Sequence, residues 1–195
     1  MRKLVYYIGA STDGYIAGPG GEVDFFPVGG AQEAAAYAAW VNERYPETVP
    51  TPMREGAGLV GTPNRRFDTV VMGGGTYRVV YEHGLSSPYA HLRQYVVSGG
   101  FATAPDPAVT AVGGDPLALV RDLKKEAGGD IWLCGGGGLA GSLLPEIDEL
   151  ILKTYPVVAG AGIPVFAGGF DPTPFTVTAR EPFPNGVLIT WLARR

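Results

Sequence analysis

The stretch Ile131-Trp132-Leu133-Cys134-Gly135-Gly136-Gly137-Gly138-Leu139-Ala140-Gly141 runs from bulky apolar residues through four consecutive glycines into small and apolar residues. Its bulky apolar residues predict a buried strand over Ile131–Cys134, and a short helix is predicted after the glycines, over Leu139–Leu144. Because glycine has no Cβ, a ligand can lie against the backbone here, and the first N–H groups of the helix can bind a phosphate.

A second run of the same kind occurs earlier, in Val70-Val71-Met72-Gly73-Gly74-Gly75-Thr76-Tyr77. It also passes from an apolar strand through glycines into a predicted helix. Both turns are therefore candidate seats for the phosphate groups of a nucleotide.

The later run has two other interpretations. Gly136, Gly138 and Gly141 have the spacing of a Rossmann dinucleotide fingerprint, which requires an acidic residue about 20 residues on, at the end of the next strand. That strand ends in Lys153-Thr154-Tyr155-Pro156-Val157-Val158, without an acid, which argues against the fingerprint. The glycines could instead only pack the helix against the sheet, although four in a row have a high entropy cost on folding.

The rest of the chain alternates between short apolar strands and helices. Further strands are predicted over Leu4–Gly9, Thr69–Met72, Gln94–Ser98, Ala108–Val112 and Glu149–Val158, and helices over Ala31–Tyr45, Thr76–Glu82 and Pro116–Glu126. At the end, Phe175–Arg180 and Val187–Ala193 flank the turn Pro184-Asn185-Gly186 and predict a hairpin. This order predicts one α/β domain over residues 1–195, with a mostly parallel sheet and antiparallel C-terminal strands.

Composition argues against several classes of protein. With 15 basic and 19 acidic residues the formal charge is −4, so the basic excess of nucleic-acid-binding proteins is missing. The single cysteine, Cys134, lies in an apolar run and is expected to be a buried small side chain, and the two histidines give no pattern for a metal site. No apolar segment reaches the roughly 18 residues of a membrane span, and the apolar run Leu4–Ala10 lacks a signal-cleavage pattern, so we expect a cytoplasmic protein with no membrane partner.

Four stretches stand in an order that resembles a known family: Ser11–Ala17, Val71–Tyr77, Tyr95–Ser98 and Leu133–Leu152, the last extended by Pro156–Phe166. They resemble, in turn, a serine-x-aspartate-glycine signature, a glycine-arginine-x-threonine-tyrosine cofactor turn, a strand ending in serine beside the adenosine, and a glycine-rich pyrophosphate loop with its helix and next strand. These are motifs of the dihydrofolate reductase superfamily. The closer likeness is to its riboflavin-biosynthesis reductase branch, the C-terminal domain of the bacterial bifunctional deaminase-reductase.

The resemblance implies a dihydrofolate-reductase-like three-layer fold and an NAD(P)H-dependent oxidoreductase. Such an enzyme transfers a hydride to a C=N or C=O of a small pterin-, pyrimidine- or similar heterocyclic substrate. It also implies NADPH as cofactor and a homodimer. The cofactor-binding residues that it implies are Gly73, Gly74, Gly75, Thr76, Ser98, Gly135, Gly136, Gly137, Gly138 and Leu139.

Two positions depart from the family pattern. Many relatives place a basic residue after the glycine that corresponds to Gly73, where it meets the 2′-phosphate of the adenosine, but this chain has Gly74. After Ser98, where relatives often have Arg, Lys or Thr, it has Gly99 and Gly100. Losing a charge-assisted phosphate contact costs about 1.5–3 kcal/mol, so NADH is an alternative cofactor.

Two acids are the candidate catalytic residues. Asp13 stands at the end of the first strand, beside the place that the resemblance implies for the nicotinamide, although Asp-Gly is itself a turn signal. Asp24 stands where relatives enter the helix on the substrate side, and it could orient the substrate or cap a turn. Four nearby aromatic side chains could line a substrate pocket or belong to the core: Phe25, Phe26, Tyr37 and Trp40.

A riboflavin-pathway substrate would need a basic pocket for its ribose phosphate, and the candidates for it are Arg54, Arg65 and Arg66. The C-terminal hairpin, with Trp191, could be core or the edge of a dimer. A second functional class stays open: a non-catalytic nucleotide or small-molecule binding protein on the same fold. The glycines at 74, 99 and 100 favour it, whereas the loop Gly135–Gly138 favours cofactor binding in either case.

Overall fold

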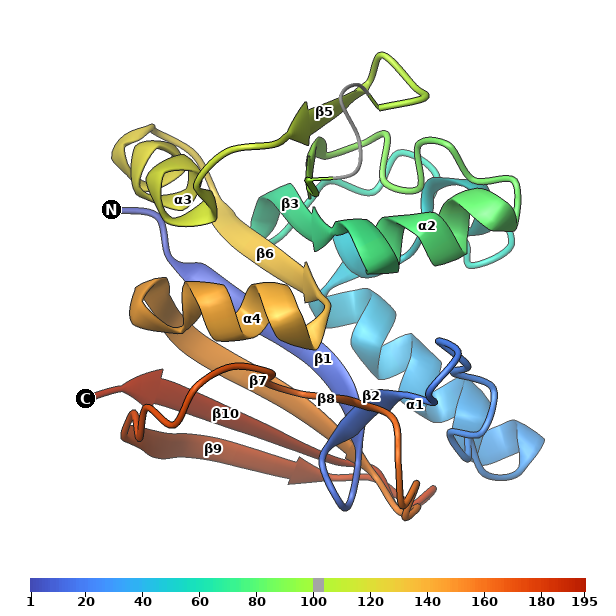
Figure 1. Cartoon of the computed structure of the whole chain (residues 1–195). Helices are drawn as coiled ribbons and strands as arrows, with labels where there is room; N and C mark the ends of the chain where they lie inside the picture. The colour runs from blue at the N-terminus through green and yellow to red at the C-terminus, as the bar shows by residue number, and fades with distance from the viewer. Residues whose placement is uncertain (100–103) are drawn as a thin grey trace.

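The computed structural model describes residues 1–99 and 104–195, and Gly100 therefore lies outside the described residues. The strands of its central sheet are β1 (Leu4–Ser11), β3 (Phe67–Gly73), β4 (Arg93–Val97), β5 (Val109–Val112), β6 (Asp130–Gly135), β7 (Ile147–Tyr155), β9 (Phe175–Pro182) and β10 (Leu188–Arg194). Within the described residues they lie in the order β5-β4-β3-β6-β1-β7-β10-β9 (Figure 1).

The direction of the strands confirms the predicted fold class. The six strands from β5 to β7 pair in parallel, whereas β10 is antiparallel both to β7 and to β9. The parallel strands carry runs of buried apolar residues because both faces of the sheet are covered. Their carboxyl ends therefore lie at one edge of the sheet, which includes Gly73 and Gly135.

Helices cover the two faces of the sheet in pairs, which makes three layers. On one face, the side chains of α1 (Ala31–Arg44) and α2 (Gly74–Glu82) pack against a core that includes Tyr7, Trp132 and Ile151. On the other face, α3 (Pro116–Lys125) and α4 (Gly137–Leu143) cover a second core. Figure 1 shows both chain termini at the same side of the molecule.

Most predicted bounds agree with the structure to within a few residues. Asp115 caps α3 as its sequence position suggests, its side chain accepting the N–H of Leu117 at 2.9 Å. The largest difference is in β7, which begins at Ile147 and ends before Pro156 rather than spanning residues 149–158. A proline cannot donate to the ladder, and the strand ends there.

A small second sheet was not predicted. β2 (Tyr15–Ala17) pairs antiparallel with β8 (Ile163–Pro164) beside the carboxyl edge of the main sheet. Gly162 has φ +153°, and a Cβ on it would overlap the carbonyl oxygen of Ala17. This close approach fixes the second sheet, and with it one wall of the site described below.

The segment 46–64, predicted to be a long loop, is mostly irregular but contains two short 3-10 helices, Pro46–Thr48 and Thr51–Met53. Glu47 holds it to the start of β3. The carboxylate of this fully buried residue accepts the backbone N–H groups of Arg65, Arg66 and Phe67 at 3.1, 3.0 and 2.9 Å. A buried side chain that accepts three backbone N–H groups is a strong anchor.

Replacing Glu47 with glutamine is expected to lower the free energy of unfolding by about 2 kcal/mol, because one backbone N–H would face an amide NH₂ instead of a carboxylate oxygen. Denaturant unfolding measures this loss. The matched control is Glu55→Gln, at an exposed position of the same segment, with no change expected. Equal midpoints for the two variants would show that Glu47 does not anchor the segment.

No helix in the described part of the chain is long and apolar enough to cross a membrane. The cytoplasmic location expected from the sequence stays a prediction.

Candidate functional site

A glycine-lined cleft opens at the carboxyl edge of the sheet and has a volume of about 610 Å³. Both strand–glycine–helix turns contribute to it, one from β3 to α2 and the other from β6 to α4. All ten residues expected to bind a cofactor line this cleft: Gly73, Gly74, Gly75, Thr76, Ser98, Gly135, Gly136, Gly137, Gly138 and Leu139. Its size is typical of cofactor sites, and the carboxyl ends of parallel strands are where α/β proteins bind ligands.

The glycines of the two turns and of α4 differ in whether the surrounding structure leaves room for a side chain. A Cβ on Gly137 or Gly141 would overlap a backbone carbonyl oxygen, that of Pro164 or Ala167 respectively. By contrast, a Cβ on Gly75 or Gly138 would meet no atom within 4 Å. Close packing therefore explains why positions 137 and 141 are glycine, which is the second interpretation given in the sequence analysis. It does not explain why positions 75 and 138 are glycine.

At two further positions, the backbone conformation or a close contact disfavours any residue other than glycine. Gly135 has φ +139°, a backbone conformation that side chains rarely adopt. A Cβ on Gly74 would lie 2.5 Å from Oγ of Ser98. The close contact between α2 and Ser98 therefore leaves no room for a side chain at position 74 unless Ser98 moves.

Apolar side chains that the sequence analysis missed form the other wall of the cleft. They come from the end of β1 (Ile8), from β2 (Ile16 and Ala17) and from β8 (Ile163). Gly160-Ala161-Gly162, just before β8, was the signal that could have indicated this wall, because paired glycines outside a helix mark a close backbone approach. The result is a cleft that is polar along the glycine turns and apolar opposite them.

Among the described residues that line the cleft, none carries a charged side chain. Cys134 is half-buried rather than fully buried as expected, and its side chain reaches the cleft. Burial raises the pKa of this thiol to about 12, so it is protonated at neutral pH. A neutral thiol suits a binding surface and not a nucleophile.

Neither of the two candidate acids is among the described residues that line the cleft. The carboxylate of Asp13 accepts the hydroxyl of Ser11 at 2.6 Å and the backbone N–H groups of Ala159 and Gly160 at 2.9 and 2.7 Å. The hydrogen bonds from Ser11 and Ala159 are the main reason why the pKa of Asp13 falls to about 2. An ionised carboxylate cannot donate a proton at neutral pH, so Asp13 fits a positioning role better than that of a general acid.

Asp24 is exposed, in the turn before two half-buried aromatic residues. The rings of Phe25 and Phe26 lie 4.4 Å apart, and Phe26 is 4.8 Å from the ring of Tyr155 on β7. Tyr37 of α1 joins this group through an edge contact of 6.4 Å to Tyr155. Tyr37 and Trp40 each also make an edge contact of 4.9 Å to Phe183. The four aromatic residues noted in the sequence thus belong to one aromatic cluster beside β7, and the catalytic role of Asp24 stays a prediction.

The suggested basic pocket for a ribose phosphate is not formed. Arg54 is buried and donates to the backbone carbonyl groups of Pro46, Leu59 and Thr62 at 2.6, 3.0 and 2.8 Å. Arg66 is paired with Asp130 and Glu149. Both arginines therefore have their donors satisfied within the protein.

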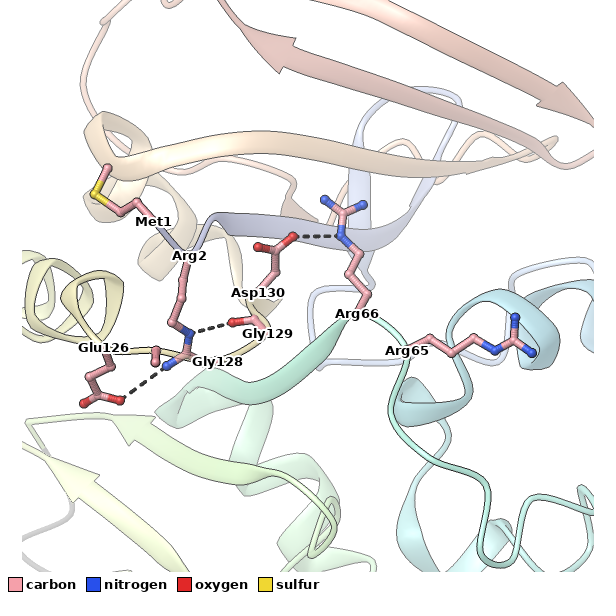
Figure 2. A pocket seen from close by; sticks show the side chains of 9 residues that line it. Met1, Arg2, Arg65, Arg66, Glu126, Gly128, Gly129 and Asp130 are labelled. Carbon is pink, nitrogen blue, oxygen red and sulfur yellow. Dashed lines mark hydrogen bonds and ion pairs between the residues drawn. The ribbon is translucent and has the colours of Figure 1, made fainter.

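A second hollow of about 400 Å³ lies at the amino ends of the strands, opposite the glycine-lined cleft (Figure 2). Arg2 donates there to the carbonyl of Gly129 at 2.5 Å and pairs with Glu126. Figure 2 also shows Arg66 directed toward Asp130, with Arg65 pointing away from these pairs. In this hollow Arg2 and Arg66 are therefore engaged by carboxylates of the protein.

No group of three or more histidine, cysteine or acidic side chains that could hold a metal occurs in the part of the chain that the structure describes.

Comparison with known proteins agrees with this architecture. The family described as RibD C-terminal domain matches residues 2–189. The uncharacterized protein YwjB of Bacillus subtilis (strain 168) is 30% identical over 195 residues, which cover 98% of each chain. The uncharacterized protein YyaP of the same organism is 46% identical over 52 residues, 26% of this chain and 28% of its own.

Two solved structures share the fold. A candidate riboflavin biosynthesis protein from Shewanella sp. PV-4 has a TM-score of 0.69 and 25% identity, with 100% of this chain and 99% of the other covered. The diaminohydroxyphosphoribosylaminopyrimidine deaminase/5-amino-6-(5-phosphoribosylamino)uracil reductase of Thermotoga maritima has a TM-score of 0.61 and 12% identity. All of this chain matches 57% of that protein, a likeness of fold alone.

Proposed function

We propose that this chain, which belongs to the RibD C-terminal domain family, is a reductase that binds a reduced nicotinamide dinucleotide in the glycine-lined cleft. The reaction is hydride transfer to a C=N or C=O carbon of a small pterin-, pyrimidine- or similar heterocyclic substrate. The observation that carries the proposal is the open space at Gly75 and Gly138, which packing does not require and a cofactor backbone can fill.

The two glycine turns would hold the cofactor, with Gly73–Thr76 on one side and Gly135–Leu139 on the other. When bound, the nicotinamide supplies the hydride. The residues of the chain bind and orient the reactants, and the apolar wall formed by Ile8, Ile16 and Ile163 keeps water from the reacting carbon.

The preference between NADPH and NADH is proposed to be weak. A 2′-phosphate is favoured by a cationic side chain, and the described lining of the cleft has none. Ser98 also blocks a side chain at position 74. We therefore propose NADPH as cofactor with NADH as an effective substitute.

A non-catalytic binding protein is the second candidate, and the uncharged cleft favours it. Two measurements on the purified chain separate the candidates: the melting temperature with each dinucleotide, and NADPH oxidation over dihydropterins, riboflavin precursors and quinonoid compounds. A reductase gives both a rise in melting temperature and turnover of at least one compound. Stabilisation without any turnover would favour the binding protein, and neither response would exclude both.

We also propose that the chain forms a homodimer. Trp191 on β10 is half-buried and donates its indole N–H to the Tyr45 hydroxyl at 3.0 Å. β9, and not β10, is the edge of the sheet. β9 is mostly exposed over its eight residues, and an exposed edge strand can pair with a second copy.

Val177, on β9 and 42% exposed, is the position that tests the dimer. Val177→Lys is expected to shift the mass measured by sedimentation from dimer to monomer, because a charged edge strand resists pairing. Val60→Lys, at an exposed valine outside β9, is the control and is expected to leave the mass unchanged. A wild-type chain that sediments as a monomer at all concentrations would contradict the dimer.

A further inference from the structure

The chain has four lysines, and one of them differs from the rest. Lys3 pairs with Glu149 at 2.5 Å, Lys124 with Asp148 at 2.8 Å and Lys125 with Asp122 at 2.7 Å. Lys153 makes no ion pair with any residue that the structure describes. Its Nζ instead lies 4.1 Å from the centroid of the Tyr7 ring.

Lys153 is in the middle of the sheet, where a lysine is uncommon. It is on β7, paired with Gly9 of β1 on one side and with Ile189 of β10 on the other. Because side chains alternate along a strand, Lys153 faces the same side as Ile151, the side covered by α1. The amine thus lies near the carboxyl edge, on the face where Tyr7 and the aromatic cluster lie.

Cys134 connects this amine to the glycine-lined cleft. Cys134 lines the cleft, and it also packs against the apolar core that contains Tyr7, the ring under the Lys153 amine. On the other side, the ring of Tyr155 lies over Gly9, the strand neighbour of Lys153. Lys153 is not itself among the described residues that line the cleft; its amine lies beyond Cys134, against the Tyr7 ring and beside the aromatic cluster. An amine among aromatic rings suits a flat heterocycle with a polar oxygen or nitrogen.

Packing does not explain why a lysine stands here. Burial lowers the pKa of Lys153 to about 8, so at neutral pH the folded protein carries a charge that its surroundings disfavour. Between about pH 8 and the ordinary lysine value of 10.5, the unfolded chain binds more protons than the folded one, and stability rises with pH. The cation–π contact with Tyr7 offsets part of this cost.

We propose that Lys153 is the substrate-binding and proton-donating residue of the reductase, an inference that rests on the proposed function. Its ammonium donates a hydrogen bond to the oxygen or nitrogen of the reducible C=O or C=N. As that carbon gains the hydride, the π electron pair moves to the oxygen or nitrogen, and an N–H bond of Lys153 breaks to give this atom a proton. The dihydronicotinamide is oxidised, and solvent returns a proton to the amine.

Other titratable groups on this face do not compete for the role at neutral pH. The elements packed around Lys153 carry the following other titratable groups: Tyr7 on β1, Cys134 on β6, Tyr155 on β7, Tyr37 in α1, Tyr45 at the C-cap of α1, and Glu47 in the 3-10 helix that follows. Burial raises the pKa values of Tyr7, Tyr37 and Cys134 above their ordinary values, so these groups hold their protons tightly. Among the groups of this face that have a resolved shift, Lys153 is the one whose pKa, about 8, is close to the working pH, as proton transfer requires.

The first test needs no substrate. The full chain is reductively methylated with ¹³C, and its four lysine signals are followed by NMR as the pH rises, with Lys153→Met identifying the Lys153 signal. That signal is expected to titrate near pH 8, with the other three above 10, and to move when NADP⁺ is added. Titration of all four signals above pH 10, with no response to NADP⁺, would overturn the proposal.

The second test uses turnover of the heterocycle that the oxidation screen identifies. Lys153→Met is expected to lower kcat/KM for this substrate at least about a hundredfold. The wild-type rate is expected to fall above pH 8, where Lys153 loses its proton. Lys153→Arg is expected to keep part of the substrate binding but not to show this fall, because a guanidinium does not titrate there. The matched control is Lys125→Met, at an exposed ion-paired lysine, with no change expected.

The rise in melting temperature with NADPH distinguishes a failure of the proposed role of Lys153 from a failure of the proposed function. If Lys153→Met still gains stability with NADPH and loses only turnover, while Lys125→Met keeps both, then both the cleft and the role of Lys153 are supported. If Lys153→Met turns over within about threefold of the wild type, with the same pH profile, the role of Lys153 is wrong while the reductase stands. If the wild type itself neither binds NADPH nor turns over, the proposed function fails.

Discussion

Replacing Gly138 with leucine is expected to abolish cofactor-induced stabilisation without unfolding the chain. A Cβ at this position meets no atom within 4 Å, so the side chain fits the protein and projects into the open space of the cleft. Leucine is also a better helix former than glycine at the start of α4. The variant therefore removes space for the cofactor while the fold keeps its stability.

The measurement is the melting temperature with and without NADPH. At about 100 times its dissociation constant, a ligand adds about 2.7 kcal/mol of apparent stability, which is about 5–10 °C for a chain of this size. The wild type is expected to show this rise and Gly138→Leu less than about 1 °C. The control is Gly169→Leu, at a glycine that also faces open space but lies outside the cleft lining. An undiminished shift in Gly138→Leu would place the cofactor elsewhere.

Replacing Gly141 with alanine is expected to lower the stability of the fold strongly, although the substitution changes neither charge nor polarity. A Cβ there would overlap the carbonyl oxygen of Ala167, whose own N–H donates to the carbonyl of Gly137 at 2.9 Å. Backbone cannot move aside as a flexible side chain can. Overpacking of this kind costs about 3 kcal/mol, which corresponds to a fall in melting temperature of about 6–12 °C.

Gly138→Ala, in the same helix, is the matched control for Gly141→Ala. Its Cβ meets open space, and the higher helix propensity of alanine predicts stability equal to the wild type or up to about 1 kcal/mol greater. Denaturant midpoints compare the two variants directly. A midpoint for Gly141→Ala equal to that of Gly138→Ala would mean that the segment 164–167 does not pack on α4 as described.

The central strands and both glycine turns could be predicted because their signals are local. The strand predicted over Ile131–Cys134 is β6, Asp130–Gly135, and the glycines after it do open a helix. Apolar runs of four to six residues bounded by glycine identify a parallel strand and its carboxyl end without knowledge of its partners. That the two turns meet in one cleft depends on β3 and β6 being neighbours, which the strand order of the folded chain shows.

The second wall of the cleft could not be predicted in the same way. β2 and β8 have three and two residues and lie about 150 positions apart, so no periodicity marks them. Their pairing depends on the approach of Gly162 to the carbonyl of Ala17, which only the fold brings together. Segments this short become strands through tertiary contacts and not through their own propensity.

Charged residues show the same limit. Arg54 and Arg66 were candidates for binding a phosphate, yet their partners are carbonyl groups and carboxylates of the protein. Lys153 was noted in the sequence only as part of a strand without an acid. Whether a charge is paired depends on contacts between distant segments, and these appear only in three dimensions.

The most direct test of the central claim is calorimetric titration of the purified chain with NADPH and with NADH. The glycine-lined cleft predicts one saturable site per chain for each dinucleotide, lost in Gly138→Leu. Because no charged side chain is found among the described residues of the lining, the two dissociation constants are expected to differ by less than about tenfold, which is about 1.4 kcal/mol. The absence of saturable binding of either dinucleotide at millimolar concentration would contradict the account.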